Sequence, residues 1–246
     1  MFRSNKEIKE GAVFISDAHF NTKNGEVFLT QLLQKIVSNE IQTSQLFLLG
    51  DIFDALFGGV PHTKVGNEEV IELIEEIAKT KEVFYLEGNH DFQLKKFFSK
   101  NINIYPLDQH PVEFTCKDQS VWLAHGDFDA PFGYMLYTKF IRNPFVLFFL
   151  NIYDSLTNHS ILRFVDKHMS KKEQCKTFDW FEEFSQKRLS QGFTCNMFID
   201  GHFHQNVTYN FKNIKYINLG AFACNQRFFV VKFIQNEIIL EENTLR

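Results

Sequence analysis

The 246-residue sequence contains few of the residues that define several protein classes. Its cysteines number only four, and none forms a CxxC pair, which argues against a disulfide framework or a zinc knuckle and favours a reducing compartment. We therefore expect Cys116, Cys175, Cys195 and Cys224 to be ordinary core residues. With 5 Pro, 12 Gly and 44% hydrophobic residues, the chain is neither collagen-like nor disordered. The longest apolar run, residues 145–150, is far shorter than the roughly 20 residues that span a bilayer.

Signals for secretion and for nucleic-acid binding are also scarce. The charged N-terminal residues run directly into an apolar stretch without a signal-peptide pattern, so we expect a cytosolic protein. The net charge of −4 gives an overall field that repels nucleic acid, and no nucleic-acid partner is expected. The unusual abundance is 30 Phe, more than a core of this size needs. Some of these rings are expected to face a ligand or a membrane.

Five short apolar runs, each followed abruptly by polar residues, are typical of buried strands. They lie at residues 12–16, 45–49, 82–86, 121–124 and 196–199. Residues 26–37 and 67–78 carry apolar side chains at helical spacing, so strands and helices alternate as in βαβ units. Four further strands, expected as antiparallel sheet, lie at 207–211, 216–218, 228–234 and 237–241.

Between residues 128 and 190 no strand pattern occurs, and aromatic and basic residues are frequent. The chain has no repeat, Gly/Ser linker or low-complexity tract. We therefore expect a single domain over residues 1–246, with residues 128–190 inserted as a helical cap over the active face.

Each of the five predicted strands is followed by residues that can bind a metal ion. The sequences are DAH at 17–19, GDIFD at 50–54, GNHD at 88–91, HGD at 125–127 and GHFH at 201–204. Ligands of α/β proteins bind at the carboxyl ends of the strands, so these segments are expected to meet. Intervals of 34, 38 and 36 residues, each the length of one strand–helix–strand step, separate Asp17, Asp51, Asn89 and His125.

The mixture of side chains in these segments suits divalent transition metals. Asp17 and His19, like His202 and His204, are two residues apart, so on an extended backbone both side chains point the same way. Imidazole, carboxylate and carboxamide groups without a thiolate suit Mn²⁺, Fe²⁺ or Zn²⁺. Their number suits two ions that share one carboxylate, for which Asp51 is the expected bridge.

Each motif alone also has an ordinary interpretation. A single DxH or GDxxD is more often a turn or a helix cap, whereas the ordered set is not. Asp54 and Asp91 are expected to hold backbone or histidine groups in place rather than bind metal, and Asp127 could do either. The histidines outside the motifs are expected to be surface or core residues: His62, His110, His159 and His168.

The set DAH, GDIFD, GNHD, HGD and GHFH, in this order from Asp17 to His204, resembles the calcineurin-like metallophosphoesterases. The resemblance implies an α/β fold, a four-layer αββα sandwich of two mixed sheets with the helical cap, and a site for two divalent ions, Mn²⁺ first, with Fe²⁺ or Zn²⁺ as alternatives. One ion would be held by Asp17, His19, Asp51 and His204. The other would be held by Asp51, Asn89, His125 and His202.

The resemblance also implies catalytic roles for two residues. Asp51 would bridge the ions. His90, next to Asn89, would donate a proton to the leaving oxygen or bind the phosphoryl group, a contribution of roughly 10²- to 10⁴-fold for a positioned acid. A purely structural hydrogen bond is the alternative role of His90.

The composition of the cap is the sequence feature that indicates the substrate. Residues 134–151 are dense in bulky apolar side chains with Lys139 and Arg142 interleaved, which suits an acyl-chain pocket or a membrane interface. A helical hairpin that packs on itself is the alternative. In length, aromatic cap and the Arg142-Asn143 step, the chain is similar to the UDP-2,3-diacylglucosamine hydrolases, although that family's better-known members have Arg where His90 stands here.

This second resemblance implies hydrolysis of UDP-2,3-diacylglucosamine to UMP and 2,3-diacylglucosamine 1-phosphate in lipid A biosynthesis. The partners would be this nucleotide-sugar lipid and the cytoplasmic face of the inner membrane, at which the protein would be peripheral. Oligomeric state has no sequence signal. The implied substrate-binding residues are Asn89, His90, Tyr137, Arg142, Lys167, Ser170 and Lys171.

Other functions stay open. The cap could simply close the site of a phosphodiesterase or phosphatase that acts on soluble nucleotides. A protein-binding scaffold with a dead site should have lost ligands, and this sequence keeps all seven. A nuclease fits the net charge poorly because such proteins usually show a basic groove.

Overall fold

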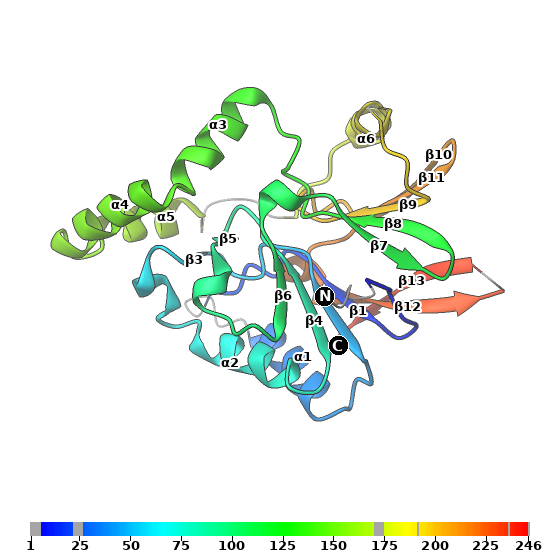
Figure 1. The fold of residues 1–246 in the computed structure, drawn as a ribbon, viewed down its shortest axis with the longest axis horizontal. Coiled ribbons are helices and arrows are strands. Elements are labelled where there is room, and N and C mark those ends of the chain that lie inside the picture. The colour runs from blue at the N-terminus through cyan, green and yellow to red at the C-terminus, as the bar shows by residue number, and fades with distance from the viewer. Residues whose placement is uncertain (1–5, 22–26, 170–174, 191, 236, 246) are drawn as a thin grey trace.

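Two mixed β-sheets pack face to face and carry helices on their outer sides (Figure 1). The computed structural model describes residues 6–21, 27–169, 175–190, 192–235 and 237–245. The first sheet has the order β13 (Glu237–Thr244), β12 (Arg227–Ile234), β1 (Val13–Ile15), β2 (Gln45–Leu48), β4 (Glu82–Leu86) and β6 (Ile102–Tyr105). The second has the order β10 (Val207–Phe211), β11 (Ile214–Asn218), β9 (Met197–Asp200), β8 (Gln119–Leu123) and β7 (Val112–Cys116).

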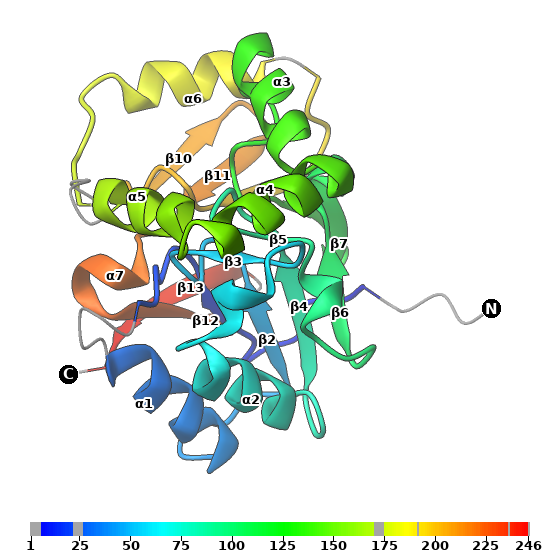
Figure 2. The same cartoon turned by 90° about the vertical axis from the view of Figure 1, so that its left-hand side faces the viewer.

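The outer layers are helical. Helices α1 (Val27–Val37) and α2 (Glu68–Ile77) lie on the outer side of the first sheet, and α6 (Phe181–Leu189) lies beside the second (Figures 1 and 2). The helical spacing of apolar residues places one stripe of α1 and α2 in the core next to β1, β2 and β4. The four-layer αββα architecture predicted from the sequence is therefore confirmed.

Aromatic rings fill the space between the two sheets. Phe14, Phe47 and Phe84 come from adjacent parallel strands and stack at centroid distances of 4.4 and 4.7 Å. Phe114 on β7 of the other sheet meets Phe47 and Phe84 edge-on. Part of the phenylalanine excess is therefore used in packing the sheets.

The predicted strands and helices are present, but the C-terminal strands pair differently from expectation. The pairs β10–β11 and β12–β13 are each antiparallel, yet the first pair extends the second sheet and the other pair extends the first. They do not form one antiparallel sheet, because β11 pairs in parallel with β9 and β12 pairs with β1. Strands β6 and β7 and the short pair β3 (Leu56–Phe57) and β5 (Asp91–Phe92) were not foreseen.

In the described part of the chain between β8 and β9, the structure has four helices. Helices α3 (Phe132–Ile141), α4 (Pro144–Leu156) and α5 (Ser160–Met169) form an arm that projects beside the edge of the first sheet (Figures 1 and 2). Helix α6 instead buries Phe181 and Leu189 against Phe198 and Tyr216 of the second sheet. Segment 128–190 thus divides into two packing environments. Among the described residues, no helix is both long and apolar enough to cross a bilayer.

The expectation for the cysteines is wrong for one pair. Cys175 forms a disulfide with Cys224 on α7 (Phe222–Asn225), with the two Cα atoms 5.7 Å apart. The pair is separated by 49 residues and lacks any local spacing pattern, so only the tertiary fold brings the two together. Cys116 and Cys195 are buried and free, as expected. Burial raises the pKa of both thiols to about 11.

Candidate metal centre

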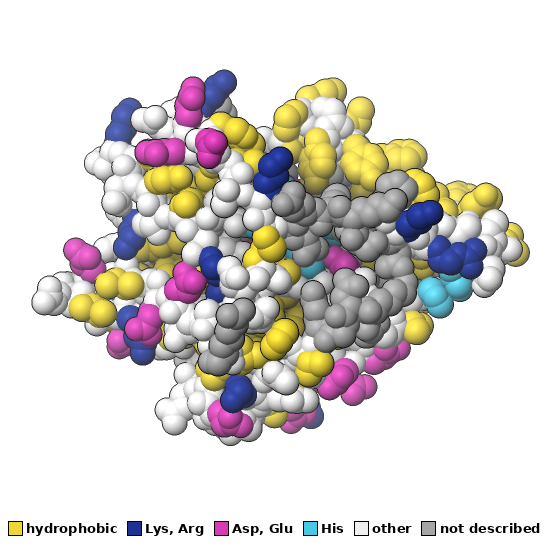
Figure 3. Space-filling view, turned by 180° about the vertical axis from the view of Figure 1, so that it is seen from behind, with side chains coloured by type: hydrophobic (Ala, Val, Ile, Leu, Met, Phe, Trp, Pro, Cys, Tyr) yellow, Lys and Arg dark blue, Asp and Glu magenta, His cyan; other side chains and the backbone are white. Residues whose placement is uncertain are grey.

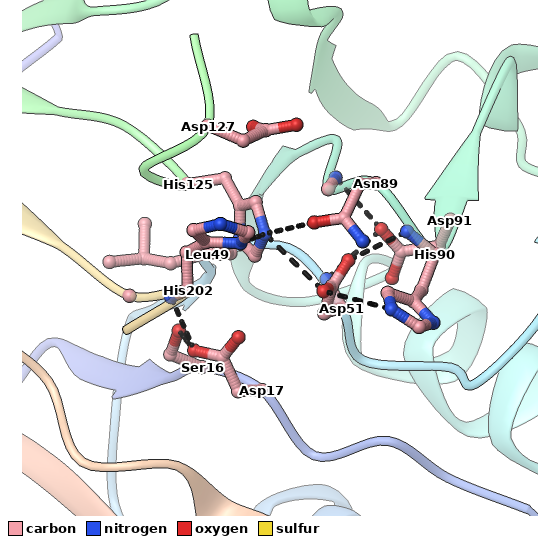
Figure 4. A network of polar contacts seen from close by, with 12 residues as sticks. Ser16, Asp17, Leu49, Asp51, Asn89, His90, Asp91, His125, Asp127 and His202 are labelled. Carbon is pink, nitrogen blue, oxygen red and sulfur yellow. Dashed lines mark hydrogen bonds and ion pairs between the residues drawn. The ribbon is translucent and has the colours of Figure 1, made fainter. Parts of the chain in front are cut away.

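The carboxyl ends of five parallel strands meet at one end of the sandwich. Strands β1, β2 and β4 are neighbours in the first sheet, and β8 and β9 are neighbours in the second. The residues that follow these strands point toward one another (Figure 4). The convergence predicted from the sequence thus draws on both sheets.

One group of side chains gathers the residues that follow β1 and one histidine that follows β9. Ligand atoms of Asp17, His19 and His204 lie within 4.8 Å of one another. Oδ1 of Asp17 is 3.1 Å from Nε2 of His204. Nε2 of His19 is buried and has no hydrogen-bond partner among the described residues. An unpartnered imidazole nitrogen next to a carboxylate is what a metal-binding site needs.

A second group surrounds Asp51, which follows β2. Ligand atoms of Asp51, His125 and His202 also lie within 4.8 Å of one another. Nε2 of His125 is 3.4 Å from Oδ2 of Asp51, 3.4 Å from Oδ1 of Asn89 and 3.2 Å from Nδ1 of His202 (Figure 4). Ligand atoms of His19, Asp51 and His90 also lie within 4.8 Å of one another, so Asp51 connects the two groups.

The charges of this site attract a cation, because its carboxylates stay ionised and hold a proton on His125 that a bound metal ion would replace. Burial would raise the pKa of Asp17, but His204 and His125 outweigh it and lower this pKa to about 2. Burial opposes protonation of His125, yet Asp51 overcomes it and holds the pKa of His125 well above its usual value. Burial and His125 lower the pKa of His202 to about 3, so its ring is neutral at neutral pH. Ionised carboxylates and neutral imidazole together suit divalent transition metals.

The backbone that carries these side chains is strained rather than extended. Asp17, His19, Asp51, His202 and His204 all have φ between 47° and 63°. Non-glycine residues rarely adopt this left-handed conformation, and such strain concentrates at functional sites. Asp17 and His19 do come together, whereas His202 and His204 join different groups, and the extended backbone expected from the sequence is wrong for both pairs.

Two carboxylates beyond these groups orient the site, as the sequence suggested. Asp54 bonds to Nδ1 of His19 at 3.1 Å, which turns Nε2 of that ring toward Asp17. Asp91 accepts hydrogen bonds from the backbone N–H groups of Asp51, residues 52–53 and Gly88, and from the hydroxyl of Tyr85. The loop after β2 is therefore tied to the loop after β4.

A close backbone approach explains one glycine of the motifs. A Cβ atom placed on Gly88 would overlap with Oδ1 and the backbone nitrogen of Asp51. No larger residue fits there without moving the carboxylate that lies between the two groups. The GNHD motif therefore needs glycine for space, although φ of Gly88 is not in the left-handed region.

Sequence reasoning missed an arginine that holds the second-sheet half of the site. Arg188 on α6 donates to Asp200 at 2.6 Å, to Asp129 at 2.6 Å and to the carbonyl oxygen of Gly126 at 3.0 Å. Its side chain is 4% exposed and that of Asp200 is fully buried. Arg188 thus ties the loop containing Gly126 to the end of β9, next to His202. Asp200 in front of GHFH was the available sequence signal, but nothing marked its partner.

His90 lies at the edge of the site. Its backbone N–H donates to Oδ1 of Asp51 at 2.8 Å, and its Nδ1 is 2.9 Å from the carbonyl oxygen of Asp54. Nε2 lies 3.9 Å from Oδ2 of Asp51. The ring is thereby fixed with Nε2 toward the site.

A cavity of about 390 Å³, which we call the cap pocket, lies beside His90 and Asn89. Most of its remaining lining is apolar, from α3, α4 and α5 and the rings of Phe57 and Phe92. The polar residues of the lining are Asp54, Thr138, Arg142, Asn151 and Asp154. Tyr137, predicted as a substrate contact, lines it. The helical segment thus encloses a hollow rather than packing on itself throughout.

Arg142 stands between the cap pocket and the candidate metal ligands. Its Nη2 donates to the carbonyl oxygen of Gly88 at 2.8 Å and lies 3.7 Å from Asp127, and its guanidinium lies 5.1 Å from the Phe92 ring centroid. Its Nε and Nη1 are buried without hydrogen-bond partners among the described residues. These unmet donors suit an anionic ligand.

The remaining predicted contacts do not join this group. Lys167 is exposed on α5 and does not line the cap pocket. Ser170 and Lys171 lie outside the described residues.

Comparisons with known proteins agree with this geometry. A family model described as calcineurin-like phosphoesterase matches residues 12–213. UDP-2,3-diacylglucosamine hydrolase of Pseudomonas fluorescens strain SBW25 is 26% identical over 198 residues, 78% of this chain and 78% of that protein. The protein of the same name from Aliivibrio fischeri strain MJ11 is 24% identical over 204 residues, 81% of this chain and 83% of that protein.

Solved structures were also matched over nearly the whole chain. An archaeal phosphodiesterase is 12% identical with a TM-score of 0.48 and covers 94% of this chain and 99% of its own. The phosphoesterase Yfce from E. coli is 13% identical with a TM-score of 0.47 and covers 96% and 99%. Given the extent of the family-model match, the chain belongs to the calcineurin-like phosphoesterase family and is a metal-dependent phosphoester hydrolase.

Proposed function

We propose that the protein hydrolyses the pyrophosphate bond of UDP-2,3-diacylglucosamine and releases UMP and 2,3-diacylglucosamine 1-phosphate. The observation that carries the proposal is the cap pocket, an apolar cavity of about 390 Å³ that opens directly on Asn89 and His90. A substrate with acyl chains and a pyrophosphate can place the chains among apolar side chains and its phosphates at the candidate metal ligands. The named relatives support the same substrate.

We assign two metal-binding groups, which fit divalent cations because they combine ionised carboxylates with available imidazole nitrogens. Asp17, His19, Asp51 and His204 would hold one ion, preferably Mn²⁺. Asp51, Asn89, His125 and His202 would hold the other. Such a pair supplies Lewis-acid activation of water and of the phosphoryl oxygens.

The chain's own residues position the phosphates and the proton. Arg142 has two buried donors, Nε and Nη1, without hydrogen-bond partners among the described residues, and they would bind a phosphate of the substrate. Nδ1 of His90 donates its proton to the carbonyl oxygen of Asp54, so Nε2 would carry a second proton toward the leaving oxygen when the ring is an imidazolium. Apolar side chains of α3 to α5, Tyr137 among them, exclude water from the acyl chains.

The exposed face of α3 to α5 supports a peripheral position at an inner-membrane surface on its cytoplasmic side. Apolar side chains gather at the upper right of Figure 3, where this arm projects. Phe132 is 80% exposed, Phe145 76% and Leu156 81%. Lys139, Arg163 and Lys167 are exposed on the same helices and can meet lipid phosphates.

Release of UMP from UDP-2,3-diacylglucosamine in mixed micelles with Mn²⁺ tests the proposed reaction. We expect turnover, and we expect Leu162→Trp, which fills part of the cap pocket, to raise KM for this lipid. A small aryl phosphodiester provides the comparison, because it needs no acyl pocket. Rapid hydrolysis of the aryl diester or of soluble nucleotides without UMP release from the lipid would reject the proposal in favour of a soluble phosphodiesterase.

Sedimentation with vesicles of phosphatidylethanolamine and phosphatidylglycerol tests the membrane position. The double variant Phe148→Asp/Phe149→Asp should release the protein, because both rings are more than half exposed on α4. Ile234→Asp on β12 is the matched control, with an apolar residue that is 50% exposed far from the arm in sequence. Equal sedimentation of both variants would contradict this position.

A further inference from the structure

A second cavity, which we call the α6 groove, reaches the candidate metal ligands from the other side. It has a volume of about 580 Å³ and lies between the beginning of α3 and α6, the helix that lies over β10 and β11 (Figure 2). Its lining includes His202, Trp180, which directly precedes α6, and Phe184 on α6. The volume falls within the roughly 300–1,000 Å³ of small-molecule sites.

Aromatic rings form a continuous wall from the metal ligand to the surface. The ring of Phe203 lies 5.0 Å from His202 and 5.3 Å from Phe184, and Phe184 lies 5.6 Å from Trp180. Trp180 stays 52% exposed although Phe178 stacks on it at 4.9 Å. A half-exposed indole beside a polar site is a suitable platform for a planar, polar ring, since nucleobases stack on aromatic side chains.

Cationic groups accompany this wall. Lys187 lines the groove, is exposed and forms no ion pair with any described residue. Arg188 also lines it but is committed to Asp129 and Asp200. Two carboxylates also line the groove: Asp129 pairs with Arg188, and Asp127 lies 3.7 Å from Nη2 of Arg142. Lys187 is therefore the uncommitted charge of the groove, and together with the aromatic surface it suits a nucleotide.

The cap pocket and the α6 groove differ in chemistry and approach different ligands. The cap pocket touches Asn89 and His90, whereas the groove touches His202, and Tyr134 lines both. A substrate that spans the metal ligands therefore meets a mostly apolar cavity at one end and, at the other, an aromatic groove with one uncommitted lysine.

We propose that the α6 groove binds the nucleoside monophosphate part of the substrate, with its base against Trp180 and its phosphate side toward Lys187 and His202. The inference deepens the proposed function and rests on it in one respect, because it takes the substrate to be a nucleotide ester. In this proposal α6 determines which nucleotide is accepted, whereas α3 to α5 determine which acyl chains are accepted.

Binding of UMP and of ribose 5-phosphate to the Mn²⁺-loaded protein, measured by isothermal titration calorimetry, tests the groove. The two probes share a sugar phosphate and differ in the base. We expect UMP to bind at least tenfold more tightly than ribose 5-phosphate. Trp180→Ala should abolish this preference, and Trp180→Phe should largely retain it. Lys187→Met should weaken both probes by a similar factor.

The ratio of the two affinities is insensitive to a general loss of folded protein, so a poorly folded variant cannot mimic the expected result. In a Trp122→Phe background, UMP should also quench the fluorescence of Trp180, the only remaining tryptophan in the sequence. An unchanged preference in Trp180→Ala, or no preference in the unsubstituted protein, would overturn the inference.

These outcomes are distinct from those of the lipid assay. Base-dependent UMP binding without cleavage of UDP-2,3-diacylglucosamine would leave the groove assigned and reject the lipid substrate. Cleavage of that lipid with a UMP affinity independent of Trp180 would do the reverse.

Discussion

Replacing Arg188 by methionine should cost about 3 kcal/mol of unfolding free energy, because it leaves the fully buried Asp200 carboxylate without its cation. Breaking a buried pair typically costs about 3–5 kcal/mol. The lower end applies here, since Asp200 keeps hydrogen bonds from the hydroxyl of Tyr216 and the amide of Asn218. Asp129 is 34% exposed on its side chain and adds little.

The same variant should show a defined pH dependence. Burial already raises the pKa of Asp200 to about 6, and Arg188 opposes that rise, so removing the guanidinium raises this pKa further. The folded variant then binds a proton that the unfolded chain releases near its ordinary pKa of about 3.9. Its stability falls as pH rises between these two values, so the deficit relative to the unsubstituted protein should be larger at pH 8 than at pH 5.

Urea unfolding followed by circular dichroism, at pH 5 and at pH 8, measures the loss of unfolding free energy and its pH dependence. In thermal unfolding, a loss of about 3 kcal/mol should lower Tm by roughly 6–12 °C. Lys187→Met removes an exposed cation from the next position and should change stability by less than about 0.5 kcal/mol. A deficit below about 1 kcal/mol for Arg188→Met, or one that does not grow with pH, would refute the role assigned to this ion pair.

Three further outcomes follow from the site. Asp54→Ala should weaken Mn²⁺ binding about 10- to 100-fold, because Nδ1 of His19 loses its partner, and calorimetric titration with Mn²⁺ would show no change if that contact were unimportant. His90→Ala should lower kcat by roughly 10²- to 10⁴-fold with Mn²⁺ affinity little changed, and a loss confined to KM would assign it to binding alone. Asp51→Ala should abolish hydrolysis at any Mn²⁺ concentration, and recovery at high Mn²⁺ would argue against a bridging role.

The strands and the metal motifs could be predicted from the sequence because both are local signals. Each buried strand is a short apolar run that ends in a distinctive polar motif, so the motif supports the strand prediction and the strand supports the ligand prediction. Strand β7 also has a local signal, an alternation of buried and exposed residues, but it was missed because Glu113 and Thr115 interrupt the apolar run. Which sheet takes β12 and β13 depends on the pairing of β12 with β1, more than 200 residues away in sequence, and no local pattern encodes it.

The parts of the site that escaped prediction depend on tertiary contacts. Arg188 lies on a helix whose sequence resembles any exposed helix, and its importance appears only when Asp200 and Gly126 are in place beside it. The disulfide of Cys175 and Cys224 depends on contact in the same way. The left-handed backbone at Asp51 is held by hydrogen bonds between loops, which the backbone N–H groups of Asp51 and Ile52 donate to the Asp91 carboxylate.

The most direct test of the account is an anomalous difference map from crystals of the protein grown with Mn²⁺. If two ions share Asp51, the map should show two peaks. One is expected among Asp17, His19, Asp51 and His204, and the other among Asp51, Asn89, His125 and His202. A single peak that Asp51 does not contact, or no peak between the ends of the two sheets, would contradict it.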